Sequence, residues 1–283
     1  MYMYYNRKNN TDILRLLCNK IKKINELNEI NELNEIILKP KRIYPLKIKR
    51  IPINQLVIKK IKPIPVLPTK VDLRSKMPPV YDQGNLGSCT ANALCAAYTY
   101  EDPTCIGSRL FLYYNERLLE YTIKEDTGAY LSDGIIALKK YGLCTELDWP
   151  YNINNFNVEP PEICYINGLK ERVITATNIP NNLKSMKNSL NSGVPFVVGI
   201  EIYSSFESQK VTKTGIVPMP NIKKEKLLGG HAVLVCGYNE SKKWWIVRNS
   251  WGTSWGDKGY FYLPYAYLTG NMASDLWNIT SVT

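Results

Sequence analysis

The sequence is poor in the residues that metal centres and disulfide frameworks need. It has 283 residues but a single histidine, His231, and its seven cysteines include no Cys-x-x-Cys pair. A zinc site of the usual cysteine and histidine kind is therefore not expected, and no cofactor is indicated. An odd number of cysteines at unpaired spacings favours reduced, buried thiols instead.

Long apolar runs are also missing. The opening MYMYYNRKNN lacks the apolar core of about 7 to 15 residues that a signal peptide has, and no later stretch reaches the roughly 18 apolar residues of a membrane span. We therefore expect an intracellular protein that makes no contact with a membrane.

Charge of one sign is concentrated at one end. The net charge is +11, and residues 1–70 hold 16 Lys and Arg against 5 Asp and Glu, whereas residues 71–283 are balanced. The excess therefore belongs to the first quarter of the chain alone. This division predicts an N-terminal region of residues 1–68 and a folded domain of residues 69–283.

The N-terminal region reads as two segments. Between Asp12 and Lys39 apolar residues recur every three positions, which predicts a helix whose apolar stripe winds around it. Residues 40–68 contain six prolines, each of which removes a backbone donor and favours an extended predecessor. We expect this stretch to be an extended basic strap.

The folded domain begins with helical patterns and ends with strand patterns. Helices are predicted from Cys89 onward, over residues 108–121, between Ser132 as N-cap and Gly142, and over residues 184–193. Short β-branched and aromatic runs predict strands at 194–202, 231–238, 243–251 and 259–264. This order predicts an α+β fold of two lobes, about 69–175 and 176–283.

Cys89 is the candidate nucleophile. A thiol at a helix N-terminus that also faces an imidazolium can have its pKa lowered from about 8.5 to about 3 to 4. His231, in GGHAVLVCGY, is the single residue in the chain able to supply that imidazole. Eighteen residues later, Asn249 offers an amide oxygen that can hold the ring, and Trp251 can shield their hydrogen bond. Taken singly, a lone histidine is more often structural and an isolated Asn-Ser-Trp-Gly is more often a turn.

Taken together, the motifs resemble the papain-like cysteine proteases, the cathepsin group. They are QGNLGSC ending at Cys89, GGHAVLVCGY, IVRNSWGTSWGDKGY, and VDLRSKMPPVYDQG, which resembles the start of the mature chains. Their order and separations carry the likeness, which covers about residues 70–283. It implies a helical left lobe, a β-barrel-like right lobe and an active-site cleft between them.

The resemblance also implies roles for individual residues. Cys89 would be the nucleophile, His231 the general base and then acid, and Asn249 the group that orients the imidazole. Gln83 and the backbone N–H of Cys89 would bind the oxyanion. Other residues are implied to contact an extended peptide: Gly128 and Ala129 by strand addition, Ala232 and Gly199 as walls of the pocket for the residue before the scissile one, Trp251 as cover for the imidazole, and, from spacing alone, Asp275 at the far end of the pocket.

Two positions depart from the family. Leu86 stands where most members have a disulfide-bonded cysteine, Thr90 stands where they have tryptophan, and no cysteine lies near Asp126. These departures resemble the disulfide-poor bacterial and viral branch that includes the xylellain-like enzymes. They favour the cytoplasm or the interior of a viral particle over a lysosomal or secreted location.

The expected function is that of a cysteine endopeptidase acting through a thioester acyl-enzyme. The alternative is a non-proteolytic papain-fold protein that binds peptides or transfers acyl groups. Residues 1–68 lie where family members carry an inhibitory prosegment that crosses the cleft in the non-productive direction, so a zymogen is expected. A polyanion-binding tether through residues 1–70 and a disordered tail are the other interpretations of the basic segment.

Overall fold

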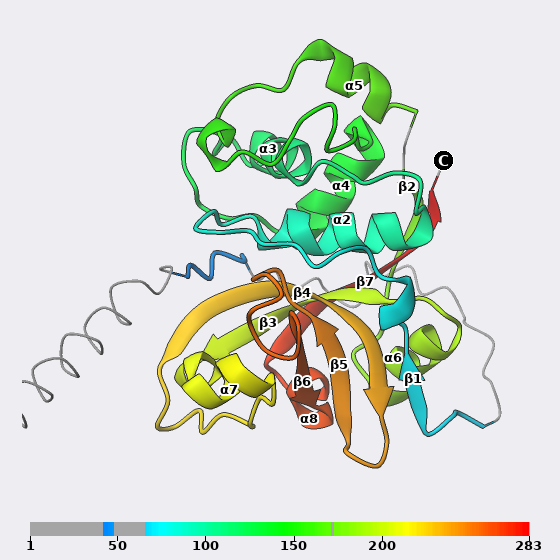
Figure 1. The fold of residues 1–283 in the computed structure, drawn as a ribbon, viewed down its shortest axis with the longest axis vertical. Helices are drawn as coiled ribbons and strands as arrows, with labels where there is room; N and C mark the ends of the chain where they lie inside the picture. The colour runs from blue at the N-terminus through cyan, green and yellow to red at the C-terminus, as the bar shows by residue number, and fades with distance from the viewer. Residues whose placement is uncertain (1–41, 48–65, 171–172, 283) are drawn as a thin grey trace, which may run out of the picture. The chain divides into compact units, whose positions relative to one another are not determined.

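The computed structural model describes residues 42–47, 66–170 and 173–282. Helices α2 to α5, within residues 89–168, gather on one side of this part of the chain, and the sheet lies on the other side together with the short helices α6, α7 and α8, within residues 183–269, which confirms the predicted α+β class (Figure 1). The helix predicted over 12–39 lies outside the described residues, as does most of the strap. Among the helices that the structure describes, none has the length and apolar character needed to cross a membrane.

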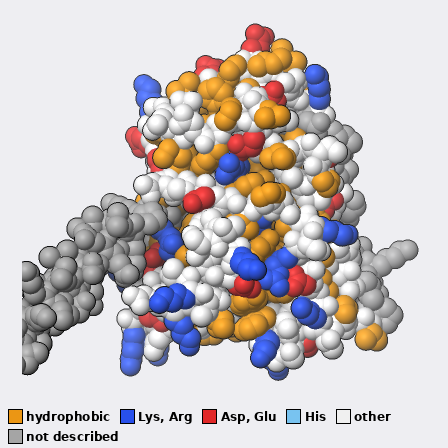
Figure 2. Space-filling model, in the orientation of Figure 1, with side chains coloured by type: hydrophobic (Ala, Val, Ile, Leu, Met, Phe, Trp, Pro, Cys, Tyr) orange, Lys and Arg blue, Asp and Glu red, His pale blue; other side chains and the backbone are white. Residues whose placement is uncertain are grey.

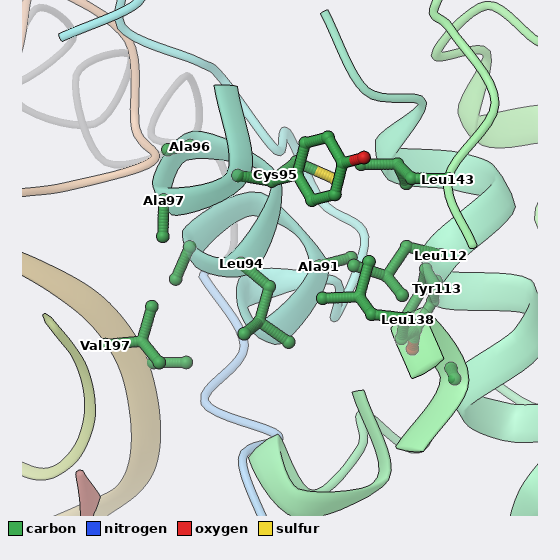
Figure 3. Packing of buried hydrophobic residues seen from close by; sticks show 14 of the residues in the cluster. Ala91, Leu94, Cys95, Ala96, Ala97, Leu112, Tyr113, Leu138, Leu143 and Val197 are labelled. Atoms are coloured by element: carbon green, nitrogen blue, oxygen red, sulfur yellow. The ribbon is translucent and has the colours of Figure 1, made fainter. Parts of the chain in front are cut away.

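The helical side is built around one buried helix. Helix α2 (Cys89–Glu101) has eleven buried residues from Cys89 to Thr99, so it is enclosed on every face. Its small residues Ala91 and Ala97 let neighbouring elements approach closely, and Figure 3 shows side chains from several elements converging on it. The surrounding helices are α3 (Arg109–Leu119), α4 (Leu131–Tyr141) and α5 (Glu162–Gly168), with the 3-10 turn η3 (Ile153–Asn155).

The start of α4 differs from the prediction. Ser132 was expected to cap this helix, but the helix begins at Leu131 and its N-cap is Tyr130, which makes no capping bond through its side chain. The Ser132 hydroxyl is buried and has no hydrogen-bond partner among the described residues. Gly142 ends the helix as predicted, at a φ of 70° that favours glycine.

The strands form one antiparallel sheet in the order β2-β7-β3-β4-β5-β6, with β1 paired to β4. Residues 70–72 therefore lie on the sheet, although they precede all the helices of the other side. The strands are β1 (Lys70–Asp72), β2 (Val173–Asn178), β3 (Phe196–Tyr203), β4 (Leu227–Asn239), β5 (Trp244–Arg248), β6 (Tyr260–Pro264) and β7 (Ala273–Val282).

The two faces of the sheet serve two apolar clusters. Val197 and Leu234 face α2, whereas their neighbours Phe196 and Val233 face away from it, as the alternation of a strand requires. The far cluster is closed by short elements: α6 (Leu183–Asn191), η4 (Ser204–Glu207), α7 (Gln209–Thr214) and α8 (Tyr265–Thr269). The 3-10 turn η2 (Arg74–Lys76) follows β1 and buries no residue. On the face seen in Figure 2, side chains of both charge signs are interspersed, in line with the charge balance of residues 71–283.

Candidate active site

Cys89 is the first residue of α2, next to the sheet. Its N-cap Ser88 makes no capping bond through its side chain, and the Cys89 side chain is fully buried. The backbone N–H of Ala232, in β4, hydrogen-bonds to the Cys89 thiol. Because Ala232 follows His231 directly, the pairing of helix and strand brings the predicted nucleophile beside the predicted base.

His231 is held by the residue predicted to orient it. Its Nε2 lies 2.9 Å from Asn249 Oδ1, which also accepts the backbone N–H of Ser250 at 2.9 Å. The shared acceptor places the imidazole proton on Nε2, so Nδ1 carries the free lone pair. Nδ1 has no hydrogen-bond partner among the described residues. Trp251 stacks on the imidazole with the ring centroids 4.9 Å apart and thereby covers this hydrogen bond.

Burial keeps both reactive groups neutral in this state. It raises the pKa of the Cys89 thiol to about 12, a tendency that the Ala232 N–H opposes. It lowers the pKa of His231 to about 4, against the opposing bond to Asn249 and with a smaller contribution from the positive charge of Arg42. The lowered thiol pKa expected for a helix N-terminus beside an imidazolium is therefore not found here, because both groups are shut off from water.

Gln83 is fixed behind the start of the helix. Its Nε2 donates to the carbonyl of Leu86 at 3.0 Å, and its Oε1 accepts the hydroxyl of Ser250 at 2.6 Å. An amide nitrogen has two hydrogens, so one remains for a further acceptor. Ser250 thus connects Gln83 to Asn249, a link that no sequence motif indicated.

A carboxylate connects the two loops that a disulfide was expected to join in related proteins. Both oxygens of Asp126 accept the backbone N–H of Gly87 at 3.0 Å, and the Tyr113 hydroxyl donates to the same carboxylate. All six cysteines in the described part of the chain are free thiols, Cys89 included. A polar link therefore ties the loop before Cys89 to the segment around Gly128.

Residues 42–47 lie against the catalytic candidates, with the ring of Tyr44 next to the imidazole of His231. The segment reaches the region between α2 and the sheet (Figure 1). The backbone of this segment pairs with Gly230, which donates to the carbonyl of Tyr44 at 3.2 Å and accepts the N–H of Leu46 at 3.1 Å. On the other side, Lys47 N–H donates to the carbonyl of Ala129 at 3.2 Å. One parallel bridge, from Pro45 to Gly230, and the bond to Ala129 thus hold the segment between β4 and the residues before α4.

Gly128 has a packing reason for being glycine. Its φ is +69°, and a Cβ at this position would lie 2.1 Å from the carbonyl oxygen of Pro45. Any side chain here would exclude the backbone of the segment. The predicted contact residues Gly128 and Ala129 therefore lie against the backbone of residues 42–47.

Leu46 fills a pocket on the sheet. Its side chain is 7% exposed, and its Cδ2 lies 2.6 Å from the position of a Cβ on Gly199. Gly199 pairs with both Ala232 and Ser274 across the sheet, so the predicted wall residues Gly199 and Ala232 are neighbours. Asp275 instead directs its Oδ1 to the indole N–H of Trp277 at 2.6 Å, while Ser274 lies opposite Gly199.

Charged residues fix both ends of the segment. Arg42 stacks over Trp251, with its guanidinium carbon 4.1 Å from the ring centroid, and pairs with Glu207 at 3.5 Å. At the other end, Lys47 forms an ion pair with Glu120. The contacts made by Leu46, Glu120 and Asp126 were not found from sequence, because no local motif marks residues that meet across such long separations.

No group of three or more His, Cys, Asp or Glu residues within 42–47, 66–170 and 173–282 is arranged to hold a metal ion.

Comparisons with known proteins give consistent results. A family model described as "Papain family cysteine protease" matches residues 67–275. "Uncharacterized peptidase C1-like protein L477" of Acanthamoeba polyphaga mimivirus is 45% identical over 217 residues, which cover 71% of this chain and 70% of that protein. "Cysteine proteinase 3" of Entamoeba histolytica is 28% identical over 202 residues, covering 69% of this chain and 62% of that protein.

Solved structures are similar as well. The crystal structure of xylellain, a cysteine protease from Xylella fastidiosa, is 36% identical with a TM-score of 0.77, covering 85% of this chain and 96% of that one. Digestive procathepsin L 3 from Tenebrio molitor larval midgut shares the fold, with a TM-score of 0.62 at 20% identity, covering 78% of this chain and 73% of that one.

Proposed function

Since the chain belongs to the papain family of cysteine proteases, we propose that it hydrolyses peptide bonds through a thioester formed on Cys89. The family, and the likeness to its xylellain-like branch, are as the motifs predicted. The observation that carries the proposal is the free lone pair of His231 Nδ1, held beside the helix start by the bond from Nε2 to Asn249.

The proposed reaction uses these groups in sequence. His231 Nδ1 takes the thiol proton, and Cys89 Sγ attacks the carbonyl carbon of the peptide bond. Gln83 Nε2 and the backbone N–H of Cys89 stabilise the oxyanion. The imidazolium then gives its proton to the leaving amine as the C–N bond breaks. Water attacks the thioester, which releases the carboxylic acid and restores the thiol.

We further propose that residues 42–47 inhibit the enzyme in its own cleft, so that the chain is made as a zymogen. In the N- to C-terminal direction, the segment runs from Arg42, which contacts Trp251, to Lys47, which contacts Ala129. A substrate whose acyl part lies along Gly128 and Ala129 runs the opposite way. The pairing of Arg42 and Lys47 with carboxylates supports this role over that of a polyanion tether.

Active-site labelling with an epoxide inhibitor of cysteine proteases tests the proposal. We expect one adduct, on Cys89, once the segment is displaced, and cleavage of extended peptides that the variants Cys89→Ala and His231→Ala lack. A Cys89→Ala protein that still cleaves peptides would refute the assignment of the nucleophile. Labelling without cleavage would favour the alternative of a binding or acyl-transfer protein.

A further inference from the structure

The far end of the cleft holds a cation, and its partners belong to the folded domain. The ammonium group of Lys47 forms an ion pair with Glu120, and its Nζ lies 3.4 Å from the hydroxyl of Thr127. The same Nζ lies 5.6 Å from the ring centroid of Tyr130, within the range of a cation–π contact. A carboxylate, a hydroxyl and an aromatic ring thus surround one positive charge.

Glu120 is fixed independently of Lys47. Its Oε1 accepts the backbone N–H of Tyr130 at 2.9 Å, and with Lys47 in place its side chain is only 7% exposed. Glu120 also caps the C-terminal end of α3, where the helix dipole adds partial negative charge. The carboxylate is therefore in place before any ligand arrives, and a buried carboxylate is stabilised by a cationic partner.

The group formed by Glu120, Thr127 and Tyr130 lies one residue farther along the cleft than the pocket at Gly199. Leu46 occupies the pocket at Gly199, and Lys47 is the next residue outward, where its N–H meets Ala129. A substrate with the opposite chain direction would place the residue before its pocket residue at this step. A long basic side chain has enough rotatable bonds to reach Glu120 from either direction.

We infer that Glu120, Thr127 and Tyr130 form a specificity subsite for a lysine or arginine that immediately precedes the substrate residue bound in the Gly199 pocket. The inference rests on the proposed peptidase function and adds the class of substrate, which is a peptide with a basic residue followed by an apolar one. Lys47 occupies the subsite as long as the segment lies in the cleft.

The test uses the full chain with Leu46→Asp, which removes the apolar anchor and opens the cleft. Two fluorogenic peptides are compared that differ only in having lysine or alanine before a leucine at the pocket position. We expect kcat/KM to be about 10-fold or more higher for the lysine peptide, as for a hydrogen bond to a charged group. Adding Glu120→Gln should lower the ratio of kcat/KM for the lysine peptide over the alanine peptide to about 1.

Glu120→Gln and its control Glu125→Gln separate the effect of the Glu120 charge from other effects of substitution. Glutamine keeps the oxygen that accepts the Tyr130 N–H, so the local fold is retained. Glu125→Gln removes the same charge from an exposed residue five positions away and should leave the preference intact. If the Leu46→Asp protein, with Glu120 intact, cleaved both peptides equally well, the subsite would be overturned and the peptidase proposal would stand. No cleavage of either peptide would refute both.

Discussion

The ring of Tyr44 meets the imidazole of His231 edge-on, with 6.2 Å between the ring centroids. A residue from the basic N-terminal region therefore covers the proposed catalytic base. Together with Trp251, which stacks on the same imidazole, it completes the enclosure of the site. A substrate can therefore reach the imidazole only after this segment has left the site.

Replacing Leu46 with aspartate should open the cleft. Leu46 is 7% exposed, and burying a carboxylate in its place costs about 2 to 5 kcal/mol. We expect peptide turnover by the full chain to rise at least about 10-fold. Val66→Asp is the matched control, because Val66 is 81% exposed. Equal turnover in both variants would show that Leu46 does not hold the segment.

Acid should release the segment. The pKa of His231 is about 4 in the covered site, whereas a solvated imidazole titrates near 6.5. Between these values the released state binds more protons, so the stability of the covered state is complete above about pH 6.5 and falls toward pH 4.

Hydrogen exchange checks this pH dependence. The amides of Leu46 and Lys47 donate across the cleft, and their protection factors in the Cys89→Ala protein should decrease from pH 7 to pH 4.5. The amide of Val233, in the middle of β4, should keep its protection. Unchanged factors at Leu46 and Lys47 would contradict the linkage to His231.

Filling the pocket should change the preferred substrate. Gly199→Val adds branches where Leu46 Cδ2 now lies, and a β-branched residue suits the middle of a strand. In the Leu46→Asp background, the kcat/KM ratio of leucine to alanine at the pocket position should fall at least about 10-fold. The ratio does not depend on how much enzyme is open, so an unchanged ratio would place the pocket elsewhere.

Glu116 should make the fold less stable as the pH rises. It is fully buried behind Cys89, where burial raises its pKa well above the usual value, and its Oε2 accepts the Thr90 hydroxyl at 2.6 Å. The folded state therefore holds a proton that the unfolded state loses above about pH 4.5. Each unit of the raised pKa lowers the free energy of unfolding by about 1.4 kcal/mol once both states would be ionised.

Urea denaturation at pH 5 and pH 8 tests this linkage. The midpoint of the unmodified chain should fall with rising pH, whereas Glu116→Gln, which has no proton to lose, should fall less. Exposed Glu125 provides the control, and Glu125→Gln should follow the unmodified chain. Parallel midpoints for all three proteins would argue that Glu116 is ionised in the fold.

Much of the site could be read from short motifs. Cys89, His231 and Asn249 each stand in a local pattern whose chemistry is recognisable, and the helix and strands that carry them follow from apolar periodicity. The start of α4 lies two residues before the predicted one, because the capping preference of Ser132 is weak compared with the packing that buries its hydroxyl.

The remaining features depend on residues that meet across long separations. Asp126 reaches Gly87, Glu120 reaches Lys47, and Leu46 reaches Gly199, and none of these pairs shares a motif. The prolines predicted an extended strap and the family resemblance predicted its direction in the cleft, but neither predicted which of its residues meet which residues of the cleft.

The residue types along the chain thus specified the reactive groups and the elements that carry them, since both depend on local chemistry. The protonation state of those groups followed from folding, because burial of Cys89 and His231 favours their neutral forms. Packing likewise placed Leu46 in the pocket at Gly199 and paired Lys47 with Glu120, because it brings together side chains that are far apart in the sequence.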